Sequence, residues 1–267
     1  MKRFITLVIS IAITLYTNSS LFAQSPYKIS WEKDGYILGA GSATAAAGFL
    51  FYRSVSSPTS SEVNQLSRGS INWFDRNATY NYSEKADKTS DILYGVATVA
   101  PFALFTDKTM RDDWKTITLM YLETWSFIGG TSMLAKGTIE RFRPFIYNPD
   151  VPLNKKLNSD AKMSFFSNHT ATAFASAIFI STVYCDYNPD SELKPYIWAG
   201  SLIIAGTVGF LRYEAGAHFP TDIIAGAILG SAIGYGIPWM HRIGEQDVSV
   251  IPYAPYAEYG LTVQVKF

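Results

Sequence analysis

One cysteine, three histidines and no net charge limit what this 267-residue chain can do. Because Cys185 has no second cysteine to pair with, the chain has no internal disulfide, and we expect a buried structural thiol. Basic and acidic residues balance at 22 each, which removes any electrostatic argument for a nucleic-acid partner. No carboxylate cluster and no Cys/His spacing in the sequence indicates a metal site, and no cofactor is expected.

Charge is scarce as well as balanced. Charged residues make up 16% of the chain, which is little for a soluble surface. The mean hydropathy of +0.08 is nevertheless low for a protein that crosses a membrane many times. Composition therefore leaves open both a membrane-embedded and a soluble helical protein.

The first residues have the order of a secretory signal peptide. Lys2 and Arg3 precede an apolar run, and a small residue, Ala23, follows it after a short polar patch. We expect residues 1–23 to be a signal peptide that is cut after Ala23. Leu21 is a mediocre residue for the third position before the cut, so an uncleaved anchor stays open. In either case the chain is exported or inserted into a membrane.

Six apolar runs without strand alternation predict an all-α fold, a six-helix bundle within a domain over residues 24–246. Each run is about long enough to span a bilayer or to fill the core of a bundle. The polar stretch 53–90 separates the first two runs and is assigned no chemistry. The runs are residues 36–52, 92–105, 116–135, 169–184, 196–211 and 223–240.

The C-terminal tail has a different pattern. Hydrophobic residues alternate with small or polar ones, which predicts a short β-hairpin over residues 247–267. The terminal Phe267 resembles the end of an outer-membrane barrel. One hairpin cannot close a barrel, because its edges would be left unpaired in lipid, so a surface ribbon is favoured. The alternating residues are Tyr259, Leu261, Val263, Val265 and Phe267.

Three polar patches at predicted helix ends hold the residues that can carry chemistry: residues 136–144, 164–170 and 211–222. Each patch also has an ordinary interpretation, as surface charge beyond a helix end or as an N-cap. Two of the three histidines fall within the patches, His169 and His218, and this joint occurrence favours a site.

The patches together suit an anion. Lys136, Arg143 and Arg212 supply fixed cations, and a helix that starts near His169 adds free backbone N–H groups. Two histidines on opposite sides of such an anion supply a nucleophile and a general acid. The expected site therefore lies at helix ends.

Asp222 lies one turn beyond His218, next to Pro220, whose fixed φ suits the start of a helix. We expect Asp222 to accept a hydrogen bond from the imidazole and so to fix its tautomer.

The three patches resemble the signature of the type 2 phosphatidic acid phosphatase superfamily, which includes bacterial acid phosphatases and vanadium haloperoxidases. The family pattern is Lys, six residues, Arg-Pro; then Pro-Ser-Gly-His; then Ser-Arg, five residues, His, three residues, Asp. This chain departs from it at Phe166, Asn168 and Leu211, which replace Pro, Gly and Ser. The spacing is kept at Lys136, Arg143-Pro144, Ser167, His169, Arg212, His218 and Asp222.

The resemblance implies a metal-independent phosphatase with a phosphohistidine intermediate. His218 attacks phosphorus, Asp222 orients and charge-stabilises it, and His169 protonates the leaving oxygen and then activates water. The remaining site residues hold the phosphoryl oxygens: Lys136, Arg143, Arg212, Ser167 and the backbone N–H of Asn168.

The six apolar runs resemble the membrane branch of the family, whose substrates are lipid phosphates and diphosphates such as phosphatidic acid, phosphatidylglycerol phosphate, polyprenyl diphosphate and lipid A phosphates. We expect a membrane protein of the bacterial envelope with a periplasm-facing site. Three full membrane spans after an exported N-terminus would place Lys136 in the cytoplasm, which conflicts with a periplasm-facing site. Either the run 92–105, which contains Pro101, does not cross the membrane, or the bundle is a soluble or peripheral periplasmic domain. A vanadate-dependent haloperoxidase and a non-catalytic envelope scaffold are the alternative functions.

Overall fold

The computed structural model describes residues 25–243, 248–253 and 260–265. The expected signal peptide, residues 1–23, lies outside the described residues.

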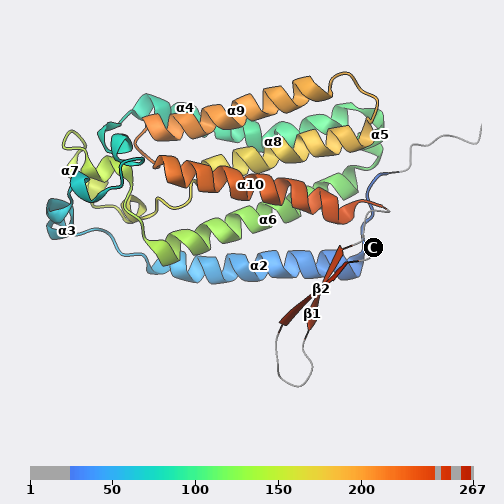
Figure 1. The fold of residues 1–267 in the computed structure, drawn as a ribbon, viewed down its shortest axis with the longest axis horizontal. Helices are drawn as coiled ribbons and strands as arrows, with labels where there is room; N and C mark the ends of the chain where they lie inside the picture. The colour runs from blue at the N-terminus through green and yellow to red at the C-terminus, as the bar shows by residue number, and fades with distance from the viewer. Residues whose placement is uncertain (1–24, 244–247, 254–259, 266–267) are drawn as a thin grey trace, which may run out of the picture.

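Six helices of 16 or more residues run along the long axis of the described part of the molecule (Figure 1). Each contains all or part of one apolar run. The chain is thus mostly helical, as an all-α fold requires. The helices are α2 (Trp31–Ser54), α4 (Glu84–Val99), α6 (Trp114–Ile139), α8 (Asn168–Tyr187), α9 (Lys194–Glu214) and α10 (Pro220–His241).

Neighbouring helices form successive layers. α2 packs on α6, α10 packs on α8, and α9 and α4 pack on α8 from the other side (Figure 1). The core between α6, α8 and α10 is made of large apolar side chains, which include Met120, Phe179 and Ile237. Burial of these side chains stabilises the bundle by about 1.5–3 kcal/mol each.

Short helices occupy the connections. At one end of the bundle lie α3 (Ser60–Gln65), η1 (Arg68–Ser70), η2 (Arg76–Tyr80), η4 (Pro144–Tyr147), α7 (Leu153–Lys156) and η5 (Ser159–Lys162). Between α4 and α6 lie the 3₁₀ segment η3 (Ala100–Thr106) and α5 (Lys108–Asp112). The long polar connections therefore gather where α4, α8 and α10 begin and where α6 and α9 end.

The C-terminal tail contains two antiparallel strands, β1 (Val248–Tyr253) and β2 (Gly260–Val265), in which Val248 is paired with Val265.

Glycines let α10 approach α8 closely. A Cβ added at Gly226 would lie 2.6 Å from the Ser167 carbonyl oxygen, and one at Gly230 would lie 2.1 Å from that of Ala171. The close approach brings the first turn of α10 against the cap of α8, where the Ser167 amide donates to the Asp222 carbonyl at 3.1 Å.

A tight turn joins α9 to α10. Gly216 adopts a φ of 69°, and a Cβ there would lie 2.2 Å from the Asn81 carbonyl oxygen, so only glycine fits. The amides of Ala217 and His218 both donate to the Arg212 carbonyl, at 3.1 and 3.3 Å. This turn fixes His218 beside the last turn of α9.

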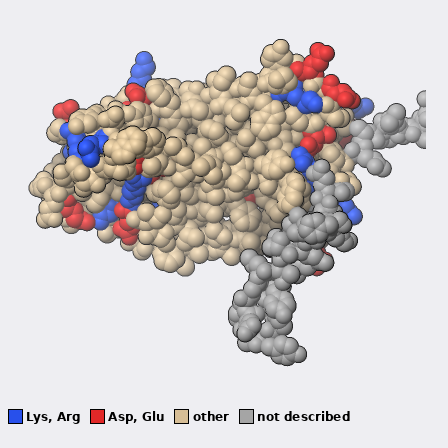
Figure 2. All heavy atoms as spheres, in the orientation of Figure 1, with Lys and Arg blue, Asp and Glu red and all other residues tan. Residues whose placement is uncertain are grey.

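Charged side chains gather at the two ends of the bundle, and the face in Figure 2 has a wide uncharged band between them. Within the described residues, two helical segments are long and apolar enough to cross a bilayer, Glu84–Thr106 and Pro220–His241. The core helices of soluble proteins also meet that criterion. The outer surface adds large exposed apolar side chains, among them Leu50, Ile92, Phe102, Ile203, Phe210 and Ile228. An exposed apolar surface of this kind marks contact with lipid or with a partner.

Candidate active site

The predicted site residues come together at the end of the bundle that carries the polar connections. Lys136 lies in the last turn of α6 and Arg212 in the last turn of α9, while His169 lies in the first turn of α8. Lys136, Arg143, Arg212 and His169 all lie near enough to His218 to act on it electrostatically. The three sequence patches are therefore one site.

His218 is held in a single tautomer. Its side chain is 1% exposed, and its Nδ1–H donates to the Ser164 carbonyl oxygen at 2.7 Å. A carbonyl oxygen can only accept, so the proton is on Nδ1 and the lone pair is on Nε2. Nε2 faces the Arg143 guanidinium, with 3.2 Å to NH1. The Nε2 lone pair thus faces the cationic side of the site.

The surroundings of His218 keep its imidazole neutral. Burial holds the pKa of His218 well below its usual value, and the nearby cations Arg143, Arg212 and Lys136 lower that pKa further. A neutral imidazole is the form that can attack phosphorus.

Asp222 does not bond to the imidazole, so the predicted hydrogen bond from His218 to Asp222 is wrong. Asp222 Oδ2 lies 3.9 Å from His218 Nδ1, beyond hydrogen-bond length. The carboxylate instead accepts from the Ser164 hydroxyl at 2.6 Å and from the Phe219 amide at 2.9 Å. Asp222 stands at the third position of α10, where a carboxylate caps the free amides of its own helix. The Ser164 carbonyl takes the predicted place of the carboxylate.

An ion-pair network formed by Arg141 and Asp75 holds Asp222 in place. Arg141 donates to Asp222 Oδ1 at 2.5 Å and to Asp75 Oδ2 at 2.7 Å. Asp75 also accepts from the Thr221 amide at 3.0 Å and from its hydroxyl at 2.7 Å. Burial alone would raise the pKa of Asp75, but hydrogen bonds from Asn72, Thr221 and Arg141 hold that pKa below its usual value. The first turn of α10 is therefore tied to the 53–90 stretch.

Arg143 is buried and is positioned by Asp160 and Ala217. Its Nε donates to the Asp160 carbonyl at 2.9 Å, and NH2 donates to the Asp160 carboxylate at 2.8 Å. NH1 donates to the Ala217 carbonyl at 3.0 Å in addition to its contact with His218. The guanidinium is thus fixed beside Nε2.

Polar groups from the start of α4 hold Arg212 and His169. Arg212 NH1 donates to Asp87 at 2.5 Å and to the Ser90 hydroxyl at 3.1 Å, while its buried Nε has no partner among the described residues. His169 Nε2 lies 2.9 Å from Asp91 Oδ1. These residues were missed in the sequence because acidic side chains in a polar helix start are ordinary.

The side chains of Lys136 and Asn168 have no hydrogen-bond partner within the described part of the chain, and both residues are half-buried. Ser167 caps α8: its hydroxyl accepts from the Thr170 amide at 3.4 Å and from the Thr170 hydroxyl at 2.9 Å. Burial and the neighbouring Arg143 lower the pKa of Lys136 to about 7, so its amine is close to half-protonated at neutral pH.

A polar cavity of about 230 Å³ opens beside the two arginines of the site. Its walls carry both signs of charge, from Asp87, Arg143, Lys155, Asp160 and Arg212.

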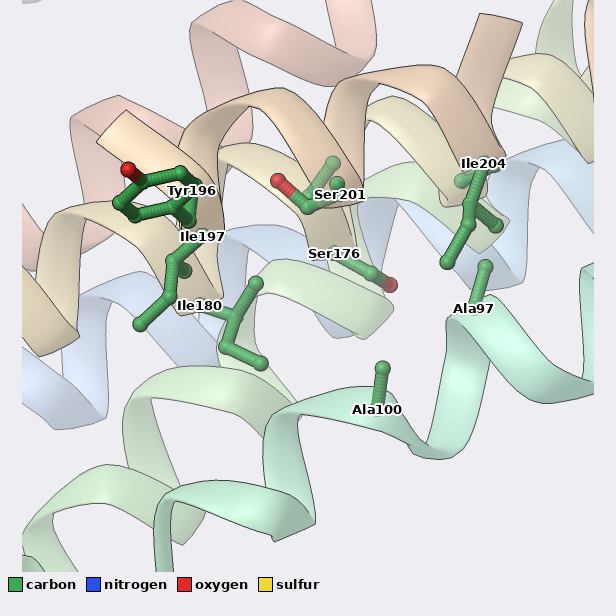
Figure 3. Close-up of a pocket in the computed structure, with 11 residues that line it drawn as sticks. Ala97, Ala100, Ser176, Ile180, Tyr196, Ile197, Ser201 and Ile204 are labelled. Carbon is green, nitrogen blue, oxygen red and sulfur yellow. The ribbon is translucent and has the colours of Figure 1, made fainter. Parts of the chain in front are cut away.

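An apolar groove of about 210 Å³ lies between α4, α8 and α9, with no charged residue in its lining (Figure 3). On α8 it begins at Ala173, one turn beyond His169. It extends away from the site along the same three helices that carry Asp91, His169 and Arg212. Figure 3 shows Ala97, Ala100, Ser176, Ile180, Ser201 and Ile204 around it.

The lowered pKa of His218 makes stability depend on pH. In the unfolded chain the imidazole binds a proton below its ordinary pKa of about 6.5, whereas the folded protein keeps it neutral. Because the unfolded state binds more protons, the free energy of unfolding falls as the pH falls below about 6.5. From pH 7 to 5.5 we expect the wild type to lose about 1 kcal/mol more than His218→Asn. Unfolding followed at both pH values checks this, and equal losses would contradict it.

Comparison with known proteins assigns this region to a family. The model of the PAP2 superfamily matches residues 114–244, a range that contains every predicted site residue. The resemblance seen in the sequence is therefore confirmed over residues 114–244.

Two relatives illustrate the similarity. Over 98 residues the chain is 30% identical to the bacitracin transport permease protein BcrC of Bacillus licheniformis. That alignment covers 37% of this chain and 42% of BcrC, so the chain matches less than half the length of this curated relative. The crystal structure of a transmembrane PAP2-type phosphatidylglycerolphosphate phosphatase from Bacillus subtilis matches with a TM-score of 0.46 and 19% identity, over 74% of this chain and 93% of that one.

Proposed function

We propose that this protein is a phosphatase that hydrolyses a lipid phosphate or diphosphate through a phosphohistidine on His218. The observation that carries the proposal is the lone pair of His218 Nε2, held 3.2 Å from Arg143 in a buried site with two further cations. A neutral nucleophile beside fixed positive charge suits a phosphoryl group. The PAP2 superfamily match supports the same chemistry.

In the proposed first step, Nε2 attacks phosphorus as the bond from phosphorus to the leaving oxygen breaks. Lys136, Arg143 and Arg212 neutralise the charge that spreads over the phosphoryl oxygens. The N-terminus of α8, with the backbone N–H of Asn168 and the Ser167 cap, adds favourable dipoles. Since Nδ1–H already donates to the Ser164 carbonyl, positive charge that develops on the imidazole is stabilised there and by Asp222 at 3.9 Å.

His169 is the proposed general acid. Burial and the cations Arg212, Lys136 and Arg143 lower the pKa of His169 to about 3 in the ligand-free site, so the ring first takes up a proton together with the phosphate dianion. It then gives that proton to the leaving oxygen and takes one from the water that attacks the phosphohistidine. That second attack breaks the N–P bond, releases phosphate and restores neutral His218. Asp91, 2.9 Å from His169 Nε2, holds the ring between these steps. All groups in this scheme are side chains or backbone of the chain itself, so the reaction needs no metal.

A lipid substrate is favoured by two surfaces. The uncharged band on the face in Figure 2 suits a bilayer, with the site at one end of the helices and, in our proposal, on the periplasmic side. The apolar groove beside His169 offers a place for a hydrocarbon chain (Figure 3). A phosphate group at the helix ends and a chain in the groove would use both.

The test is phosphate release by the full chain in detergent, across phosphatidic acid, phosphatidylglycerol phosphate, a polyprenyl diphosphate and a small soluble phosphoester, with His218→Asn alongside. Release from lipids that is lost in the variant is the expected result. No release from any substrate by folded protein would overturn the proposal and leave the haloperoxidase and the scaffold.

A matched pair of glycines on α9 tests the groove. Gly200 lines it, Gly206 does not, and a Cβ at either position meets no atom within 4 Å. Gly200→Leu is expected to lower kcat/KM for a long-chain lipid phosphate about tenfold. The new side chain would displace about two methylenes of the lipid chain from the groove, which costs ~1.6 kcal/mol. Activity toward a short-chain substrate stays unchanged, and Gly206→Leu leaves both rates unchanged. Equal losses for both chain lengths would contradict a chain-binding groove.

A further inference from the structure

Three buried titratable side chains at the other end of the bundle take no part in the proposed reaction. Asp34 lies in the first turn of α2, Glu123 lies in α6, and His241 is the last residue of α10. Their exposures are 2%, 0% and 0%. Since α10 starts at the phosphatase site and has 22 residues, this cluster is roughly 30 Å from that site at ~1.5 Å per residue.

The three side chains point their ligand atoms at one another. His241 Nε2 lies 3.0 Å from Asp34 Oδ1 and 3.3 Å from Glu123 Oε2, and all three ligand atoms lie within 4.8 Å of one another. His241 Nδ1 donates to the Ile237 carbonyl at 2.8 Å, which directs Nε2 at the two carboxylates.

Glu123 is the unusual member of the cluster. Its side chain is fully buried, yet neither carboxylate oxygen has a hydrogen-bond partner within the described residues. Asp34, by contrast, also accepts from the Ser30 amide at 2.8 Å. A buried carboxylate without a donor costs free energy unless a cation compensates it. Lys33 lies nearby, but its ammonium donates to the Met240 carbonyl and offsets only one of the two negative charges.

Either a cation between the imidazole and the carboxylates or a proton on Glu123 would remove this cost. A proton on Nε2 would serve Asp34 at 3.0 Å and leave Glu123 without a hydrogen bond. A metal ion would bind all three. With bonds of ~2.0–2.1 Å, tetrahedral ligands lie ~3.3 Å apart, which the measured separations of 3.0 and 3.3 Å approach.

We propose that Asp34, Glu123 and His241 bind a divalent transition-metal ion of the zinc class. Two carboxylates and one imidazole are ligands that zinc accepts. The hydrogen bond from His241 Nδ1 to the Ile237 carbonyl is the outer contact that usually orients a metal-bound histidine.

The proposed ion would link α2, α6 and α10, which are far apart in the sequence, at the end of the bundle where α2 starts. There the Lys28 amide donates to the His241 carbonyl at 2.8 Å, and the Ile243 amide donates to the Pro26 carbonyl at 2.9 Å. The metal thus ties the start of α2 to α6 and to the end of α10. Its role is structural, separate from phosphate chemistry.

Metal content of the full chain tests the proposal. The protein is purified in detergent without a polyhistidine tag or chelator and assayed by mass spectrometry of the elements. About one zinc per chain is expected for wild type, and less than about a tenth of that for Glu123→Gln. Glu32→Gln is the matched control, because it removes the same charge from an exposed neighbour on α2 and keeps full metal content.

A second measurement tests the proposal even if Glu123→Gln fails to fold. Wild type stripped of metal is titrated with Zn²⁺ and Co²⁺, and we expect a rise in Tm of several degrees and visible Co²⁺ absorption. No bound metal, no rise in Tm and no Co²⁺ band would overturn the proposal and leave a protonated His241 paired with Asp34. Equal metal content in Glu123→Gln would also overturn it. Neither readout uses phosphate release, so failure here leaves the proposed phosphatase untouched.

Discussion

Replacement of His218 by asparagine is expected to lower phosphate release at least about 1000-fold, the loss typical when a covalent nucleophile is removed. Asparagine is polar and similar in reach, and its amide N–H can still donate toward the Ser164 carbonyl. It has no basic nitrogen to face Arg143, so the attack on phosphorus is lost while the buried position stays filled. Single-turnover release of phosphate from a lipid substrate measures the effect.

The thermal midpoint at pH 7.5 is the control for folding, because His218 is neutral in both states there and its protonation contributes nothing. A variant that folds like the wild type and keeps more than about a tenth of its rate would show that His218 is not the nucleophile.

Replacement of Asp75 by alanine is expected to destabilise the protein by about 2–4 kcal/mol, in the range for breaking a buried ion pair. Asp75 accepts from Arg141 and from both the amide and the hydroxyl of Thr221, and it is fully buried. Its loss leaves the Arg141 guanidinium with Asp222 and the Thr221 hydroxyl, and Asp222 is then pulled from the cap of α10. Phosphate release should therefore fall as well, through misplacement of the turn that holds His218.

Unfolding in denaturant and kcat are measured together for Asp75→Ala. Asp75→Asn keeps an acceptor and should recover part of both losses. Glu84→Gln is the matched control, since it removes an exposed ion pair with Lys155 and should leave the midpoint nearly unchanged. If Asp75→Ala lowers the free energy of unfolding no more than Glu84→Gln does, the ion-pair network of Asp75, Arg141 and Asp222 has no supporting role.

The positions of the two site histidines at helix starts could be predicted from the sequence, because local signals fix where those helices begin. Pro220 starts α10 and Ser167 caps α8, as their residue types predict, so His218 and His169 had to lie at helix starts. The order of the apolar runs then brought the same helix ends together. The spacing of these residues carried the resemblance to the PAP2 superfamily, whose model matches residues 114–244.

The supporting contacts could not be predicted, because they depend on how distant segments meet. Asp75, Asp91 and Asp160 stand in polar stretches where an acidic residue is unremarkable. The Ser164 carbonyl has no sequence signature, since any residue has one, and it replaced Asp222 as the acceptor for His218. The cluster of Asp34, Glu123 and His241 has no motif spacing, so the sequence predicted no metal site where the fold brings three ligands together.

The proposed bond between phosphorus and His218 Nε2 can be observed directly. The direct measurement is to mix wild type with a ³²P-labelled lipid phosphate, quench in base within one turnover, and locate the label by mass spectrometry of peptides. We expect a phosphoramidate on His218 that survives base, is lost in acid and is absent from His218→Asn. Label on another residue, or an acid-stable phosphate ester, would contradict it.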